Sequence, residues 1–140
     1  MSRVRYLFME NHGYLLGMIE SSGVGIDIVE VDRFKKKKYE KNKIFYKKIF
    51  VCSEINYCLK FKNSAERFAA KFAIKEAVIK SISEKIHFID IEIIYKNAKP
   101  GIKLRNSLQK KYNFLVSVSH EKDFAVAVVI SEKIDRKSVV

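Results

Sequence analysis

The sequence is poor in cysteine, with only Cys52 and Cys58 among its 140 residues. Five residues separate the two, which is not the CxxC spacing of zinc sites or redox motifs. No second pair of cysteines is available to complete a metal site. We therefore expect two ordinary, semi-buried thiols in a reducing compartment.

The chain also lacks a long apolar run. No stretch approaches the roughly 20 apolar residues that a membrane-spanning helix requires. Near the start, the polar residues 10–12 interrupt any signal-peptide core, and no small-residue cleavage site follows. We expect a cytoplasmic protein without a membrane span. Residues 1–17 are an N-terminal extension of uncertain nature, for which a transit peptide or translation from Met18 are alternatives, the second being the more economical.

Acidic residues are scarce, because 16 Asp and Glu stand against 28 Lys and Arg, giving a formal charge of +12. Such an excess predicts an anionic partner: nucleic acid, a phosphorylated small molecule, a membrane surface or an acidic protein. Charge alone does not choose among them. A hydrophobic content of 48% argues for a folded globule, and the length suits one domain with a core.

Hydrophobic patterns predict both strands and helices. The predicted strands are Gly23–Val31, Ile86–Tyr95, Ile102–Leu104, Phe114–Ser119 and Phe124–Ile130. The predicted helices are Ser53–Phe61, Ser64–Ile82 and Asn106–Tyr112, after a basic helix or helix-loop region over Asp32–Phe50. The short polar link between the last two strands predicts a hairpin, and Asn97–Gly101 predicts a turn. Residues 132–140 are expected to form a charged tail.

The segment Ser64–Ile82 carries an acid where none is expected. It is rich in strong helix formers, and no Gly or Pro interrupts it. Glu76 falls within its apolar stripe, with Lys71 and Lys75 on one flank and Lys80 on the other. The stripe consists of Ala65, Phe68, Ala69, Phe72 and Ile79. Two interpretations follow: a buried ion pair with a cation from elsewhere, or a metal ligand or catalytic acid-base group between lysines that bind a polyanion.

A second acid in apolar surroundings, Asp27, lies on the first predicted strand, which reads as buried on both faces. Alternation along the strand places it on one side together with Gly25 and Val29. The preceding glycines would let a ligand or another backbone approach closely. A cap or turn residue at the strand end is the alternative interpretation.

Two carboxylates that meet repel each other unless a cation lies between them. Magnesium takes one or two carboxylates together with the phosphates of its substrate. Asp27, Glu76 and the lysines around Glu76 therefore fit a magnesium-dependent enzyme acting on a phosphorylated or pyrophosphate substrate. His120, at a hairpin turn, either hydrogen-bonds a phosphate or is merely exposed.

Three segments, in this order, resemble holo-acyl-carrier-protein synthases, which are 4′-phosphopantetheinyl transferases. They are GVGIDIVEVDRF, RFAAKFAIKEAVIK, and VSVSH followed by FAVAVVI. The hallmark is a GxD strand followed by F-x-x-K-E-A, here Gly25-Ile26-Asp27 and Phe72-Ala73-Ile74-Lys75-Glu76-Ala77. The resemblance covers residues 18–131.

The resemblance implies an α+β fold, with a small antiparallel sheet packed against helices, that forms a homotrimer with its sites between neighbouring subunits. It implies transfer of the 4′-phosphopantetheine arm of coenzyme A to a serine of apo-acyl carrier protein, with Mg²⁺ as cofactor. The other product is adenosine 3′,5′-bisphosphate, and the pathway is fatty acid biosynthesis. The base that activates the serine is either Glu76 or a metal-bound water.

The resemblance also implies roles for individual residues. Asp27 and Glu76 match the metal ligands and, together with Lys80, the catalytic set. Coenzyme A would be bound by Lys71, Lys75, Lys80, Lys99, Pro100 and His120, with Lys99 and Pro100 in a turn near the adenine. Arg33 matches the residue that docks the acidic carrier protein. Lys71 stands where relatives more often have arginine, and Ala98 replaces a glycine before Lys99.

Two alternatives belong to other classes. A basic nucleic-acid-binding domain would explain the charge of +12, but it leaves the buried acids Asp27 and Glu76 without a role. A degenerate transferase that binds acyl carrier protein without catalysis is disfavoured, because both metal ligands are present.

Overall fold

The strands Ser22–Glu30 and Phe124–Lys133 are rich in the β-branched residues Val and Ile, and the helix Ser64–Ser81 is rich in Ala, Lys and Glu. The computed structural model describes residues 19–134. In chain order its strands are β1 (Ser22–Glu30), β2 (Ile91–Lys96), β3 (Lys99–Leu104), β4 (Tyr112–His120) and β5 (Phe124–Lys133). Its α-helices are α3 (Asp32–Lys35), α4 (Lys43–Ile49), α5 (Cys52–Leu59) and α6 (Ser64–Ser81). Its 3₁₀ helices are η1 (Tyr39–Lys41), η2 (Phe88–Asp90) and η3 (Ser107–Lys110).

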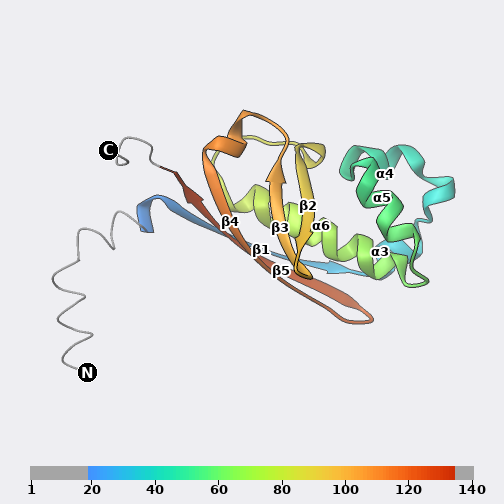
Figure 1. Ribbon diagram of the computed structural model, residues 1–140. Coiled ribbons are helices and arrows are strands. Elements are labelled where there is room, and N and C mark those ends of the chain that lie inside the picture. Colours follow the sequence, from blue (N-terminus) through green and yellow to red (C-terminus); the bar gives the residue numbers. More distant parts are fainter. Residues whose placement is uncertain (1–18, 135–140) are drawn as a thin grey trace, which may run out of the picture.

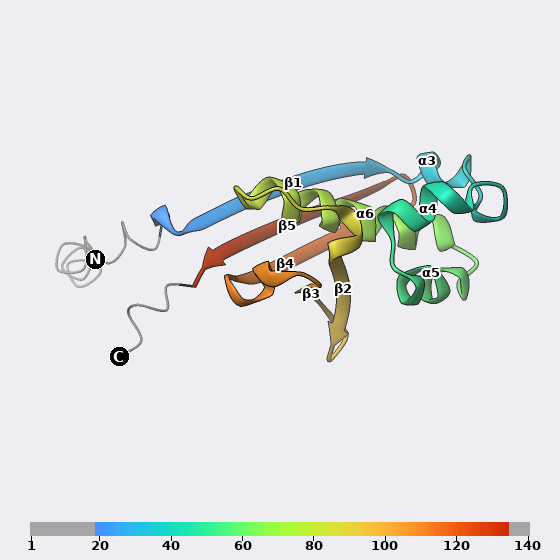
Figure 2. The same ribbon diagram turned by 90° about the horizontal axis from the view of Figure 1, so that it is seen from above.

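Two antiparallel sheets flank the long helix α6 (Figures 1 and 2). The first sheet has the strand order β1-β5-β4, so that the chain's first strand pairs with its last. The second sheet is the β2–β3 hairpin. The predicted hairpin of the last two strands is present as β4 and β5, and the expected α+β fold class is confirmed.

Helix α6 lies very close to β1. A Cβ placed on Gly25 would lie 1.8 Å from the backbone oxygen of Ala77, and one on Gly23 would lie 1.8 Å from that of Ser81. The sheet presents Ala125, Ala127 and Val129 of β5 to the same helix, all fully buried. Small side chains on both strands therefore allow the helix and sheet backbones to approach.

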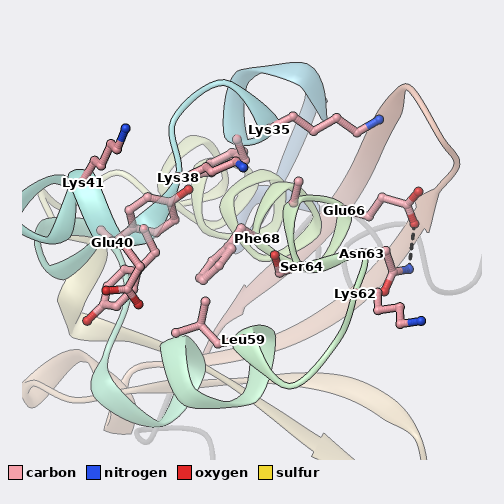
Figure 3. A pocket seen from close by; sticks show the side chains of 14 residues that line it. Lys35, Lys38, Glu40, Lys41, Leu59, Lys62, Asn63, Ser64, Glu66 and Phe68 are labelled. Carbon is pink, nitrogen blue, oxygen red and sulfur yellow. Dashed lines mark hydrogen bonds between the residues drawn. The ribbon is translucent and has the colours of Figure 1, made fainter.

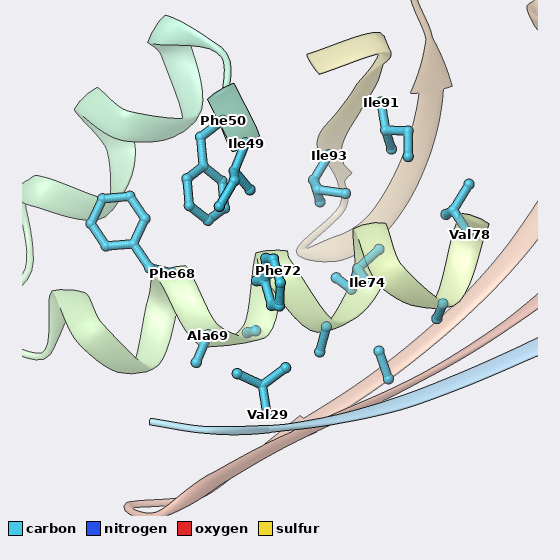
Figure 4. Packing of buried hydrophobic residues seen from close by; sticks show 14 of the residues in the cluster. Val29, Ile49, Phe50, Phe68, Ala69, Phe72, Ile74, Val78, Ile91 and Ile93 are labelled. Carbon is cyan, nitrogen blue, oxygen red and sulfur yellow. The ribbon is translucent and has the colours of Figure 1, made fainter. Parts of the chain in front are cut away.

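The opposite side of α6 contacts the short helices and β2, and Figure 4 shows α6 between these and the first sheet. An aromatic cluster fills this part of the core, with ring centroids 4.7–6.4 Å apart among Phe34, Phe45, Tyr46, Phe50, Phe68 and Phe72. The expected apolar stripe of α6 is buried at Phe68, Ala69 and Phe72. The helix is thus covered on most of its circumference, which explains why its sequence pattern is only weakly amphipathic.

Several predicted elements differ from those observed. The helix predicted at Asn106–Tyr112 is the short η3, because Tyr112 turns into the core and starts β4. The strand predicted from Ile86 begins only at Ile91, after η2, in which Asp90 accepts a hydrogen bond from the backbone N–H of His87. The helix predicted from Ser53 begins at Cys52, and its first turn is closed by Glu54, whose carboxylate accepts from the N–H of Val51.

The β2–β3 turn is tighter than predicted. It consists of Asn97 and Ala98, both with positive φ, at 53° and 63°. Lys99 and Pro100, expected within the turn, are the first residues of β3. The left-handed conformation strains Ala98, which stands where the resembling family has glycine.

One face of β1 is exposed within the single chain, against the expectation of a strand buried on both faces. Val24, Ile26 and Ile28 are 59–66% exposed. Strand β5 extends through Lys133, into the predicted tail. The predictions for residues 1–17, for Met18 and for the end of the tail, 135–140, lie outside the described residues. Within residues 19–134, no helix is long and apolar enough to cross a membrane.

We predict that Gly25→Ala destabilises the protein by about 3 kcal/mol, because the added methyl group would overlap the carbonyl of Ala77. Urea unfolding measures the loss. Gly101→Ala is the matched control, since its Cβ would make an ordinary contact of 3.5 Å with the Ile94 side chain. Equal stability of the two variants would contradict the close approach of α6 and β1.

Candidate active site

A pair of carboxylates forms where β1 crosses α6. Asp27 points from the middle of β1 toward the helix, and its side chain is 16% exposed. Lys80 reaches back from the last turn of α6, with its Nζ 2.9 Å from Asp27 Oδ1 and 3.2 Å from the carbonyl oxygen of Ile26. Glu76, one helical turn before Lys80, is half-buried beside them. Asp27 of the GxD motif and Glu76 of the F-x-x-K-E-A motif are therefore adjacent in space.

The electrostatics of Glu76 reflect this crowding. Burial raises the pKa of its carboxyl group, and the negative charge of Asp27 raises it further. The positive charges of Lys80 and Arg33 act in the opposite direction. The pKa of Lys80 is raised by its hydrogen bond to Asp27. A carboxyl group whose ionisation is disfavoured by a neighbouring carboxylate is a site to which a further cation would be attracted.

The donor set suits a hard cation that completes its shell with substrate oxygens. Within residues 19–134, no group of three or more His, Cys, Asp or Glu side chains is placed to hold a metal ion. Asp27 and Glu76 thus offer only two protein ligands, both oxygen donors. This is how proteins commonly bind Mg²⁺ at phosphate substrates, whereas structural zinc sites use four protein ligands. The residues present therefore fit magnesium.

Arg33 lies next to this site on the short helix α3. Its guanidinium carbon is 4.8 Å from the centre of the Phe72 ring, and its charge is felt at Glu76. The side chain is exposed. Arg33 is therefore available both to a ligand at the carboxylates and to a partner bound over α3.

Lys75 is fully buried, although it directly precedes Glu76. Its Nζ lies 2.6 Å from Glu54 Oε1 and donates to the carbonyl oxygens of Ile49 and Phe88 at 2.8 and 3.1 Å. Burial lowers the pKa of Lys75, and the charge of Glu54 partly offsets this. Removing one partner of such a pair typically costs about 3–5 kcal/mol. A buried ion pair, one of the two interpretations of Glu76, is thus formed instead by the preceding residue, Lys75, with Glu54.

Sequence reasoning missed Glu54. Its side chain is 2% exposed and accepts from the backbone N–H groups of Val51 and Ile93 as well as from Lys75. The available signal was the one used for Glu76: an acid on the apolar side of a helix, four residues before the buried Cys58. That thiol is buried and Cys52 is exposed, whereas both were expected to be semi-buried. Burial raises the pKa of Cys58 to about 12.

Lys71 is also buried, on the side of α6 that faces the second sheet. Its Nζ lies 3.3 Å from the hydroxyl of Tyr95 and 4.9 and 4.6 Å from the ring centres of Tyr57 and Tyr95. Burial lowers the pKa of Lys71. Tyr95 pairs with Pro100 across the hairpin, and Lys99 is exposed beside it. These residues form a second group, apart from the carboxylates.

His120 ends β4 on the face of the sheet that carries α6. Its Nδ1 is 4.0 Å from Glu66 in the first turn of α6. Glu66 and Glu76 are ten positions apart, which is about 15 Å along a helix. Within one chain, therefore, His120 lies at the other end of α6 from the carboxylates.

A family model for the 4′-phosphopantetheinyl transferase superfamily matches residues 23–129, which is more than half of the chain. The match includes Asp27 of β1 as well as Glu76 and Lys80 of α6. The chain belongs to the 4′-phosphopantetheinyl transferase superfamily. Among curated members, the holo-(acyl-carrier-protein) synthase of Caldicellulosiruptor bescii is 41% identical over 120 residues, covering 79% of this chain and 97% of its own. That of Geobacter metallireducens is 32% identical over 123 residues, covering 80% and 98%.

Solved structures of the superfamily agree with this assignment. The holo-(acyl-carrier-protein) synthase of Helicobacter pylori, in complex with coenzyme A, has a TM-score of 0.66 and 32% identity, covering 78% of this chain and 99% of its own. That of Bacillus anthracis, in complex with coenzyme A (3′,5′-ADP), has a TM-score of 0.66 and 32% identity, covering 80% and 96%. The family predicted from three sequence segments is thereby confirmed.

We predict that Glu76→Gln stabilises the protein at pH 7. A pKa raised by folding means that the folded state binds more protons than the unfolded state between the ordinary value of 4.5 and the raised value. Stability therefore falls as the pH rises through that window, and the loss persists above it. Because the half-exposed position screens the effect, we expect a gain in Tm of only about 1–3 °C at pH 7.

Thermal unfolding of wild type and Glu76→Gln at pH 7 and at pH 4 measures the difference. The gain should shrink at the lower pH, where the wild-type carboxyl group is largely protonated. A variant less stable than wild type at pH 7 would show that Glu76 is held by favourable interactions and not crowded by Asp27.

Proposed function

We propose that the chain transfers the 4′-phosphopantetheine arm of coenzyme A to a serine of apo-acyl carrier protein, with Mg²⁺ held by Asp27 and Glu76. The observation that carries this proposal is the meeting of these two carboxylates with Lys80 at the crossing of β1 and α6. Membership of the superfamily supplies the reaction class. The proposed transferase domain is residues 18–131.

In this mechanism the serine oxygen attacks the β-phosphorus of coenzyme A, and the bond to the bridging oxygen breaks to release adenosine 3′,5′-bisphosphate. Bound Mg²⁺ would offset pyrophosphate charge. Lys80, whose amine is half-exposed at the site, stabilises the charge on the leaving group. Glu76 accepts the serine proton directly or through a water, a role favoured by its raised pKa.

The remaining coenzyme contacts are assigned to two places. Lys71 contacts Tyr95, Pro100 pairs with Tyr95 across the hairpin, and Lys99 directly precedes Pro100. These three residues are proposed to bind the nucleotide part. His120 is proposed to bind a phosphate. Lys75, which the resemblance also placed near the coenzyme, has its amine buried against Glu54, and its contribution is considered in the next section.

The carrier protein is proposed to dock over α3 and the adjoining cavity. Figure 3 shows this cavity, of about 530 Å³, with Phe68 and Leu59 at its base and lysine side chains around it. Lysines 35, 38, 41 and 62 line it, and Arg33 lies on the same helix as Lys35. Glu40 and Glu66 also line the cavity, but the lysines outnumber them. An apolar base with a basic surround fits an acidic helical surface with protruding apolar side chains better than it fits a nucleic-acid backbone.

The proposed assembly is a homotrimer with sites between subunits. It is supported by the outer face of the β1-β5-β4 sheet, which no element of residues 19–134 covers (Figure 1). Its exposed apolar side chains are Val24, Ile26, Ile28, Leu115 and Ile130. Large exposed apolar patches mark interaction sites. A neighbour packed here could supply the His120 that a single chain keeps at the far end of α6.

We place the reaction in the cytoplasm, within fatty acid biosynthesis. The two cysteines are free, which suits a reducing compartment. The net charge of +12 is then explained by acidic and phosphorylated partners, without nucleic acid.

The proposed activity is tested by the intact mass of apo-acyl carrier protein after incubation with the chain, coenzyme A and Mg²⁺. We expect a gain of about 340 Da, the mass of the transferred arm. Asp27→Ala and Glu76→Ala should each slow the gain at least about 100-fold, because the cation site is lost. Glu30→Ala, which removes an exposed carboxylate from the same strand, should leave it unchanged. No gain with several carrier proteins and a folded wild type would refute the proposal.

The proposed trimer is tested by light scattering of Leu115→Asp, which puts a charge on the outer face where the side chain is 71% exposed. We expect wild type at three times the 16.3 kDa chain mass, and the variant at the chain mass with its transfer activity lost. The matched control is Ile44→Asp, since Ile44 is 74% exposed on α4, away from the sheet. A monomeric wild type, or a monomeric variant with full activity, would contradict the shared site.

A further inference from the structure

Glu54 and Lys75 are the centre of a buried polar network that joins five segments of the chain. Both Glu54 oxygens are used, Oε1 by the N–H of Val51 and by Lys75, and Oε2 by the N–H of Ile93 at 2.9 Å. The Lys75 amine fills its three donor positions with Glu54, Ile49 and Phe88. The network therefore ties α6 to the end of α4, the start of α5, η2 and β2.

The position of Lys75 in α6 gives this network a direct relation to the active site. Consecutive helical residues point about 100° apart, so Lys75 faces the short helices while Glu76 faces β1. A fixed Lys75 amine therefore fixes the rotation of α6 about its axis, and its position along that axis. The same rotation determines where the Glu76 carboxylate lies relative to Asp27.

On the sheet side, the directional contacts of α6 lie in its last turn, where Lys80 donates to Asp27 and Ile26 and where the carbonyl oxygen of Ser81 accepts from Ser131 Oγ. Around Gly25 and Ala77 the surface is apolar and gives no direction to the contact. The Glu54–Lys75 network supplies directional contacts on the opposite side. Metal sites require ligands held within about 0.5 Å of the productive geometry.

We propose that Glu54 and Lys75 are positioning residues, which hold α6 in the rotation that places Glu76 beside Asp27. This inference rests on the proposed function, because the position of Glu76 matters through the cation and the transfer. Neither side chain has a group left for the substrate in this arrangement, since the three donor positions of Lys75 and both oxygens of Glu54 are engaged within the chain. The role differs from direct coenzyme binding by Lys75, and the two are separable by experiment.

The test uses Lys75→Met, which keeps the length of the side chain and removes its charge. We measure Mn²⁺ binding by electron paramagnetic resonance without coenzyme A or carrier protein, together with kcat and KM. Positioning predicts at least tenfold weaker Mn²⁺ binding and a kcat lowered at least tenfold, with the KM for coenzyme A within about threefold. Direct coenzyme binding by Lys75 predicts the reverse, a raised KM with unchanged Mn²⁺ affinity, and that result would overturn the inference.

Three further variants guard against a general loss of structure. Lys75→Arg keeps the charge and the donors and should recover most of the Mn²⁺ affinity. Glu54→Gln combined with Lys75→Met leaves no unpaired buried charge, so it should fold where the single variant does not, with the same weak Mn²⁺ binding. Leu104→Ala, a buried change in β3, should lower stability without altering Mn²⁺ affinity.

The outcomes separate this inference from the proposed function. A wild type that binds Mn²⁺ but transfers nothing would contradict the proposed function alone. A wild type that transfers normally beside a folded Lys75→Met with unchanged Mn²⁺ affinity and kcat would overturn the positioning role alone. A wild type that binds no Mn²⁺ would overturn the cation site and the positioning role together.

Discussion

The contact between the backbones of β1 and α6 is the constraint on which the site depends. Gly23 and Gly25 leave no room for a side chain between strand and helix. This close approach brings Asp27, two residues after Gly25, within reach of Lys80 and of the field of Glu76. Glycine weakens a strand in general, so the sequence gives up strand stability here and gains a carboxylate pair at a fixed separation.

The crowded carboxylates on the β1 side of α6 lower the stability of the fold, whereas the hydrogen-bonded Glu54 and Lys75 on the opposite side of the helix stabilise it. Glu76 is crowded by Asp27 and carries a raised pKa, whereas Glu54 accepts hydrogen bonds at both of its carboxylate oxygens. Of the two carboxylates beside β1, Asp27 is paired with Lys80, whereas no salt bridge within residues 19–134 involves Glu76. Glu54, on the opposite side, is paired with the buried Lys75. Lys75 and Glu76 are consecutive, yet they point to different sides of α6. The charge of Lys75 is neutralised by Glu54 inside the fold, whereas the charge of Glu76 faces Asp27.

Much of the fold could be predicted from periodicity. Helix α6 runs from Ser64 to Ser81, against a predicted Ser64–Ile82, because its composition and its apolar stripe agree. The hairpin β4–β5 was equally accessible. The predictions failed where tertiary contacts or local side-chain hydrogen bonds decide the structure. Tyr112 belongs to a strand because its side chain enters the core. Ile86–Asp90 stays out of the strand because the Asp90 side chain accepts a hydrogen bond from the N–H of His87 and so stabilises η2. The exposed face of β1 could not be inferred, since an apolar strand face that the chain covers and one that it leaves exposed can have the same sequence.

The site shows the same limit at the level of single residues. A charged residue on an apolar helical face is a local signal, and it identified Glu76 without revealing whether a partner exists. For Lys75 the partner is Glu54, 21 positions away, and for Asp27 it is Lys80, 53 positions away. Neither separation follows a helical or strand period, so only the fold can show which charges meet. A motif such as Lys75-Glu76 therefore marks two charged neighbours on a helix, and only the fold shows that Lys75 is buried against Glu54 while Glu76 stays accessible beside Asp27.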